Sequence, residues 1–202
     1  MTTDNIANST VPDGSTDAWR DNKRYLWLIG LVVPSLAFVA AAVYIVTGVG
    51  AILWIGPIII LGVVPAIDLF AGLDKSNPPD DAIEALEKDK YYRWITYLFL
   101  PIQYLGFVWA IYMIARGDPL GIGGDLVLWE KIGLAISIGM IGGIGINTAH
   151  ELGHKKESHE RWLSKIALAP VFYGHFYIEH NRGHHVRVAT PEDPASLSLI
   201  HI

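Results

Sequence analysis

The residues of this chain best suited to chemistry are its histidines, and seven of the eight lie between positions 150 and 185. His150 and His154 stand four residues apart in the run HELGH, and His180, His184 and His185 follow in the run HNRGHH. Side chains four residues apart lie on one face of a helix about one turn apart, so both imidazoles of such a pair can reach one ion. These five histidines are predicted to be metal ligands, and the triple could serve two ions.

The ligand atoms that the chain can offer limit which metals it could bind. The chain has no cysteine, which excludes zinc–thiolate sites and iron–sulfur clusters and leaves nitrogen and oxygen ligands. HELGH also fits the HExxH pattern, in which Glu151 would be the general base of a zinc protease. A catalytic zinc takes three protein ligands, however, and the second cluster supplies too many. Imidazole ligation also suits iron in oxygen chemistry, so iron is the preferred metal. A membrane zinc protease remains the alternative.

The composition indicates a membrane protein. Hydrophobic residues make up 51% of the 202 residues and charged residues 17%, whereas a soluble domain is usually about one quarter charged. A net charge of −5 argues against a nucleic-acid partner, which would need a basic face. The sequence has no glycine-rich phosphate-binding motif, so no dinucleotide site of its own is predicted.

Four apolar stretches follow a polar segment, residues 1–18, which is predicted to be a disordered tail. Each is long enough to cross the hydrocarbon core, which takes about 20 residues; they are 26–47, 51–73, 94–115 and 126–147. Polar residues 74–93 are predicted to be a loop with a surface helix. Lysine and arginine gather before the first stretch, between the second and third, and after the fourth, which places the N-terminus and the histidines in the cytoplasm. The predicted fold is therefore an all-α polytopic membrane helical bundle.

Several other residues have weaker signals. Glu151 and Glu179 neighbour histidines, and carboxylates often orient metal-bound imidazoles, so both are candidates for that role. Asp68 is an ionisable residue within an apolar stretch and His175 precedes the second cluster; both are candidates to support the metal site. Glycines 139, 142, 143 and 145 are expected to allow close packing of the fourth membrane helix.

Three motifs together resemble one known family. NTAHELGHKKE (147–157), YGHFYIEHNRGHH (173–185) and VATPEDPAS (188–196) are similar to segments of the integral-membrane alkane 1-monooxygenases, within the wider histidine-box group of fatty-acid desaturases, sterol hydroxylases and xylene monooxygenases. The runs KRYLW, VPAIDLFAGLDKSNPP and KYYRWITYL extend the likeness over residues 23–196. The histidine boxes are shared across the group, whereas EHNRGHH with VATPEDPAS is more specific to the alkane hydroxylases.

The resemblance implies a non-haem di-iron enzyme with six transmembrane helices in the bacterial inner membrane. His150, His154, His180, His184 and His185 match its first two histidine boxes. Such enzymes use O2 to hydroxylate the terminal methyl of n-alkanes, with electrons from NADH through rubredoxin reductase and rubredoxin. A related desaturase or hydroxylase of fatty acyl, sterol or aromatic substrates remains the alternative with the same chemistry.

The chain also departs from the family pattern. The family has two further elements, an NYxEHYG-type segment and a final HxxHH box, which this sequence does not contain. Residues 19–196 are therefore expected to be an incomplete membrane di-iron hydroxylase domain, and residues 197–202 (LSLIHI, with His201) a non-native tail. We expect this chain alone to bind metal incompletely and to lack activity.

Overall fold

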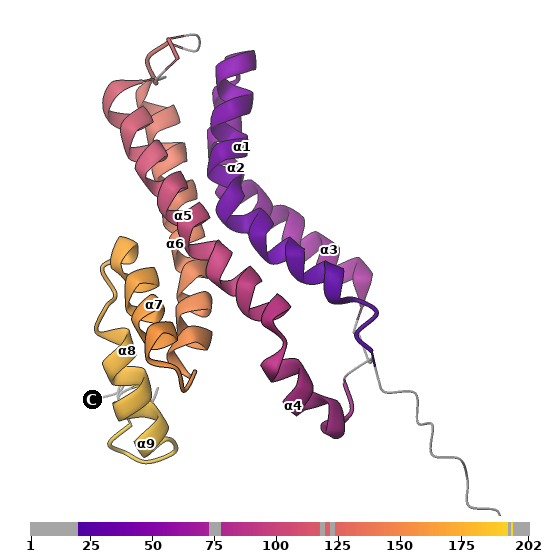
Figure 1. The fold of residues 1–202 in the computed structure, drawn as a ribbon. Helices are drawn as coiled ribbons and strands as arrows, with labels where there is room; N and C mark the ends of the chain where they lie inside the picture. Colours follow the sequence, from indigo (N-terminus) through magenta and orange to yellow (C-terminus); the bar gives the residue numbers. More distant parts are fainter. Residues whose placement is uncertain (1–19, 73–77, 118–119, 122–123, 194, 196–202) are drawn as a thin grey trace, which may run out of the picture.

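The computed structural model describes residues 20–72, 78–117, 120–121, 124–193 and 195. The predicted disordered tail (1–18) and the predicted non-native tail (197–202) lie outside these residues. Among the described residues every regular element is a helix, so the all-α prediction is confirmed (Figure 1). The elements are η1 (Arg24–Leu31), α1 (Val32–Thr47), η2 (Gly50–Trp54), α2 (Ile55–Pro57), η3 (Ile58–Val63), α3 (Val64–Ala71), α4 (Asp80–Lys88), α5 (Lys90–Arg116), α6 (Leu128–Gly153), α7 (Ser158–Leu168), η4 (Ala169–Val171), α8 (Phe176–Ile178), η5 (Glu179–His184) and α9 (His185–Arg187).

Four helical segments are long and apolar enough to cross a membrane, as predicted. They are Arg24–Thr47, Gly50–Ala71, Lys90–Arg116 and Leu128–Gly153. The predicted surface helix between the second and third segments is α4. The fourth segment continues to Gly153, six residues beyond the predicted apolar stretch, which ends at 147. That extension puts the first histidine pair on the same rigid helix that crosses the membrane.

The second segment is a composite of short helical pieces, for which proline gives a physical reason. Pro57 and Pro65 have no backbone N–H, so the carbonyls one turn earlier lose their usual partner and the hydrogen-bond register shifts. The register changes from 3-10 in η2 to a π-helix in η3 before α3 begins. The core of the bundle forms where α1 and the first half of this segment meet α5 and α6, around buried residues such as Ala40, Leu53 and Met113.

The glycines of α6 divide into two groups. A Cβ on Gly142 would lie 2.6 Å from Val171 Cγ1, and a Cβ on Gly145 would lie 2.5 Å from Gln103 Nε2. Gly139 and Gly143 have no such neighbour within 4 Å, so the prediction that all four glycines allow close packing is wrong for these two. They lie on an exposed face of α6, because α5 and η4 approach the helix from its other side.

One end of the bundle gathers most of the charged segments among the described residues. The beginning of η1, helix α4, the end of α6 and helices α8 and α9 lie at this end, and the α5–α6 connection lies at the opposite end (Figure 1). Arg24 Nη2 contacts Asp89 Oδ2 at 3.2 Å, and Arg93 Nη1 contacts Glu157 Oε1 at 3.0 Å. The basic segments and the histidines therefore lie at the same end of the bundle, as predicted.

Candidate metal centre

The first two histidines occupy the last turn of α6. His150 lies within the helix and His154 is its C-cap residue, held by a backbone hydrogen bond from its N–H to the carbonyl of His150. Leu152 and Gly153 are buried beneath them, and a Cβ on Gly153 would lie 3.2 Å from Ser164 Oγ of α7. Close packing of α7 thus fixes the direction in which both imidazoles project.

The second histidine cluster returns to the first because the chain reverses twice. Helix α7 runs back along α6, and after η4 the chain turns at Phe172 and descends through α8 and η5 (Figure 1). Residues Glu179–His184 form a π-helix, in which successive turns relate residues five apart. His180 and His185 therefore face each other, with their Nε2 atoms 2.9 Å apart. His184, four residues after His180, stacks on the His180 ring with centroids 5.5 Å apart, and its Nδ1 faces Asp193.

Four Nε2 atoms converge in this arrangement. His150 Nε2 is 3.0 Å from His154 Nε2, and His154 Nε2 is 3.3 Å from His180 Nε2. One ligand atom from each of His150, His154, His180 and His185 lies within 4.8 Å of the other three. Each neutral imidazole has one lone-pair nitrogen, so a single cation among these atoms would accept four donors at once.

Carboxylates hold the opposite nitrogens of two rings. Glu151 Oε1 lies 3.2 Å from His150 Nδ1, and both carboxylate oxygens of Asp193 lie 3.0 Å from His184 Nδ1. A carboxylate that accepts the Nδ1 proton fixes the tautomer in which Nε2 carries the lone pair. These contacts orient His150 and His184 as Nε2 donors.

Desolvation keeps two of the clustered imidazoles, His154 and His180, in the form that binds metal. Desolvation, with the neighbouring imidazoles as a secondary cause, lowers the pKa of His180 to about 4. The same causes lower the pKa of His154. Both rings are therefore neutral at pH 7, and protons compete weakly with a cation for their lone pairs.

The remaining predicted residues lie farther out. Glu179 is exposed and its Oε2 is 3.9 Å from His175 Nε2, while the His175 ring packs edge-on against Tyr173. Neither residue is among the four that converge. Asp68 is exposed on α3, which lies on the other side of α5 and α6 from α8 and α9 (Figure 1). The structure does not bring Asp68 to the histidines.

Asp193 is the residue that the sequence interpretation missed. It is only 4% exposed, and its Oδ1 accepts a hydrogen bond from the backbone N–H of Ala195 at 2.9 Å. That hydrogen bond, followed by the contact with His184, lowers the pKa of the Asp193 carboxyl. Its place in the family-like run VATPEDPAS was the available signal, but nothing in the spacing of Asp193 and His184 predicted their contact.

An aromatic side chain completes one wall of the cluster. The Phe176 ring stacks on His180, with centroids 4.9 Å apart and planes 15° apart. The His184 ring also stacks on His180, with centroids 5.5 Å apart. The described residues thus fit one cation held by four imidazoles, with His184 beside it and oriented as a donor to a second position.

Comparison with known proteins agrees with this geometry. Residues 128–199, which contain α6 and all five histidines, match the family model "Fatty acid desaturase". The chain is 42% identical over 186 residues to "Alkane 1-monooxygenase 1" of Alcanivorax borkumensis, covering 91% of this chain and 44% of the relative. It is 40% identical over 189 residues to "Alkane 1-monooxygenase" of Pseudomonas putida, covering 93% of this chain and 45% of the relative.

A third relative gives the same picture. "Alkane 1-monooxygenase" of Ectopseudomonas oleovorans is 40% identical over 183 residues, with 90% of this chain and 44% of the relative covered. The chain thus spans less than half of the length of the curated relatives that it matches. This chain is a membrane protein that is similar to part of the proteins named alkane 1-monooxygenase, and the region that holds its histidine cluster matches the family model "Fatty acid desaturase".

Proposed function

We propose that this chain forms part of a membrane monooxygenase that hydroxylates the terminal methyl group of n-alkanes to primary alcohols with O2. The observation that carries the proposal is the convergence of four imidazole Nε2 atoms at one end of a membrane helix bundle. The similarity to three proteins named alkane 1-monooxygenase supports the choice of substrate.

The proposed cofactor is a pair of non-haem irons. His150, His154, His180 and His185 would hold one ion, and His184 would contribute to the second. When bound, the irons would supply the activation of O2 and the oxidation of the methyl C–H bond. An all-imidazole donor set adds no negative charge, so the ions would keep a strongly positive net charge.

The residues around the ligands have a positioning function in this proposal. Glu151 and Asp193 hold Nδ1–H of their histidines, so that Nε2 faces inward. Phe176 covers one face of His180 and limits the approach of water from that side. Fixed ring orientation matters because misplacing a ligand lowers metal affinity.

An apolar cavity supports entry of substrate from the bilayer. It has a volume of about 270 Å³ and lies between η1, α5 and α6, lined by apolar residues such as Trp27, Val33 and Phe99. Its lining also includes Asn147 and Glu151, beside the first histidine. An n-alkane partitions into lipid, so a cavity with apolar walls that ends near the histidines fits such a substrate.

The electron supply is proposed to be external. NADH would reduce a rubredoxin reductase, and rubredoxin would carry electrons to the histidine end of the bundle. The lysines and arginines at that end favour a cytoplasmic location in a bacterial inner membrane, where a soluble donor can dock.

A membrane zinc protease is disfavoured by one contact. In that class the glutamate of HExxH acts on a water at the metal. Here Glu151 contacts Nδ1 of His150, whereas the converging atom of that ring is Nε2. The glutamate therefore lies on the other side of the imidazole from the position where a cation would be held.

A chimera tests the proposed activity. This chain would replace the matched 186-residue part of the Alcanivorax borkumensis relative, which supplies the remaining length. Membranes with the chimera should form 1-octanol from octane when O2, rubredoxin, rubredoxin reductase and NADH are present.

The matched control is the same chimera with His154→Ala, which should reach the membrane and form no 1-octanol. A chimera that inserts and binds two irons but forms no terminal alcohol from any n-alkane would overturn the proposal. Proteolytic activity with one bound zinc would favour the alternative.

A further inference from the structure

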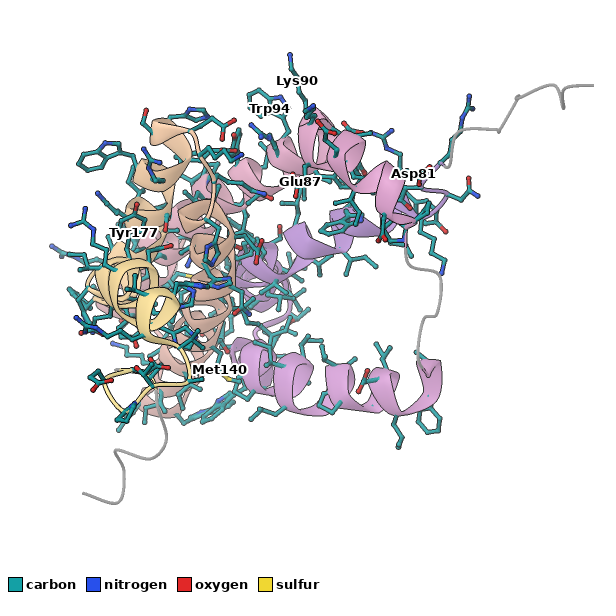
Figure 2. The ribbon with its side chains drawn as sticks, turned by 90° about the horizontal axis from the view of Figure 1, so that it is seen from below. Asp81, Glu87, Lys90, Trp94, Met140 and Tyr177 are labelled. Atoms are coloured by element: carbon teal, nitrogen blue, oxygen red, sulfur yellow. The ribbon has the colours of Figure 1, made fainter. Side chains whose placement is uncertain are left out.

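A polar pocket, separate from the apolar cavity described above, lies beside α7. It has a volume of about 420 Å³ and is lined by Ser158, Arg161, Trp162, Lys165, Tyr177 and Arg182. Tyr177 lies on the side of the bundle opposite Asp81 (Figure 2). Three of the six lining residues are permanently or normally cationic, although the chain as a whole has a net charge of −5. The positive charge at this pocket is therefore local.

No carboxylate of the described residues neutralises these three cations. Arg161, Lys165 and Arg182 form no ion pair within the described part of the chain. Arg161 Nη1 donates to the backbone carbonyl of Lys156 at 2.9 Å, and Lys165 Nζ lies over the rings of Trp162 and Tyr177, 4.5 and 4.9 Å from their centroids. The cations are thus positioned without an acidic partner.

The acidic residues of this region face another neighbour. Glu157, the N-cap residue of α7, contacts Arg93 Nη1 at 3.0 Å, and the buried Glu160 accepts from the Tyr97 hydroxyl at 2.5 Å. Both contacts join α7 to α5. Helix α7 therefore has an acidic side that contacts α5 within the bundle and a basic side that is open to the surroundings.

The exposed apolar residues near the basic side show at which level of the membrane-spanning helix α6 this side lies. Val171 packs against Gly142, eleven residues before the end of α6, which corresponds to about 16 Å along the helix axis. This level lies within the span of α6. Ile166 and Phe172, near that level, are 44% and 91% exposed, and Trp162, which lines the basic pocket, is 63% exposed.

Exposed apolar side chains occur toward the end of α7 and just beyond it, whereas Trp162 lies between the two cations of α7, Arg161 and Lys165, nearer its beginning. This arrangement matches a membrane interface, where apolar side chains contact acyl chains and tryptophan and cations lie at the headgroup level. We propose that the pocket formed by Arg161, Lys165 and Arg182 binds the phosphate group of an anionic membrane phospholipid. The inference rests on the membrane location of the helices and is independent of the proposed iron chemistry.

Lipid binding to the purified chain in detergent tests the proposal. Native mass spectrometry would measure adducts with phosphatidylglycerol and with phosphatidylcholine of the same acyl chains. The chain should bind one phosphatidylglycerol more tightly than phosphatidylcholine. Each cation near an anionic headgroup contributes about 1 kcal/mol, so Arg182→Gln should weaken phosphatidylglycerol binding about fivefold, and Lys165→Gln with Arg182→Gln about 25-fold.

Two matched variants control for charge and for folding. Arg116→Gln with Lys131→Gln removes the same charge near the opposite end of the bundle and should leave phosphatidylglycerol binding unchanged. Lys165→Arg keeps the charge and should keep the binding, so a loss in Lys165→Gln alone cannot be ascribed to an unfolded helix.

Several outcomes would overturn the proposal. Equal binding of the two lipids would do so, as would an unchanged phosphatidylglycerol affinity in the double variant. Displacement of the lipid by millimolar inorganic phosphate would assign the pocket to a free anion. Binding of soluble polyglutamate without a preference for phosphatidylglycerol would assign it to an acidic protein segment.

Discussion

The two ends of α6 both carry ionisable side chains, and the two sets are arranged in opposite ways. At the beginning of the helix, Glu130 is buried and its Oε2 accepts hydrogen bonds from the backbone N–H of Val127 at 2.9 Å and the Tyr44 hydroxyl at 3.4 Å. At the other end, His150 and His154 direct Nε2 atoms toward further imidazole nitrogens. The glutamate has donors from its own protein, whereas the histidines mainly face other acceptors.

The difference separates a structural polar group from a ligand set. A buried polar group that supports the fold is paired with complementary groups, as Glu130 is. Several lone-pair nitrogens that share one point are best satisfied by a shared cation. Changes at the two ends should therefore affect different properties: metal binding at the histidine end and stability at the glutamate end.

The largest effect is expected from His154→Ala. His154 Nε2 lies between those of His150 and His180, so its loss removes one of four donors and the link between the two clusters. Affinity for Fe²⁺ or Co²⁺ should fall more than about 100-fold, beyond the usual effect of changing a supporting residue. A metal titration of the purified chain measures this, with His159→Ala as the control because His159 contacts Tyr97 rather than the cluster. Equal losses in both variants would contradict the assignment.

A smaller effect on metal binding is expected from Asp193→Ala. Removing the carboxylate frees the His184 ring and its tautomer, and residues in this position typically contribute about 10–100-fold in metal affinity. The titration should show the loss in the iron-loaded chimera, where both proposed ions are present. Asp193→Asn keeps an acceptor for Nδ1–H and should retain most of the affinity. If Asp193→Ala binds both irons normally, His184 is not held as a ligand by this contact.

The smallest effect is expected from Glu130→Gln, and it should appear in stability alone. The substitution weakens the charge-assisted hydrogen bonds to Val127 N–H and the Tyr44 hydroxyl in a buried site, at a cost of about 1–3 kcal/mol in the free energy of unfolding. Denaturation followed by circular dichroism in detergent measures this cost. Metal affinity should stay unchanged, and a parallel loss of metal would show that the two ends are coupled.

The sequence predicted the membrane helices well because length and apolar composition dominate insertion into a bilayer. All four spans were found, and the common side of the basic segments was correct. The apolar stretch ends at residue 147, and the polar last turn of α6 continues the helix to Gly153, where packing against α7 keeps it helical. The breaks in the second span depend on local proline geometry that hydropathy does not report.

The sequence predicted which histidines form the site better than it predicted how they are arranged. Spacing and clustering along the chain selected five histidines, and four of them converge in the structure. The π-helix that pairs His180 with His185 was not predictable, since a shifted register depends on tertiary packing. The contact of Asp193 with His184 likewise requires a chain reversal. Asp68 was selected on the general cost of a charge in a membrane, and it lies on an exposed helix away from the cluster.

X-ray absorption of the iron-loaded 202-residue chain tests the central claim most directly. The chain would be titrated anaerobically with Fe²⁺, its metal content measured and its coordination shell determined. The structure predicts one tightly bound iron with a shell of about four imidazole nitrogens, lost in His154→Ala. An oxygen-only shell, no bound iron, or two tightly bound irons in this chain would contradict the account.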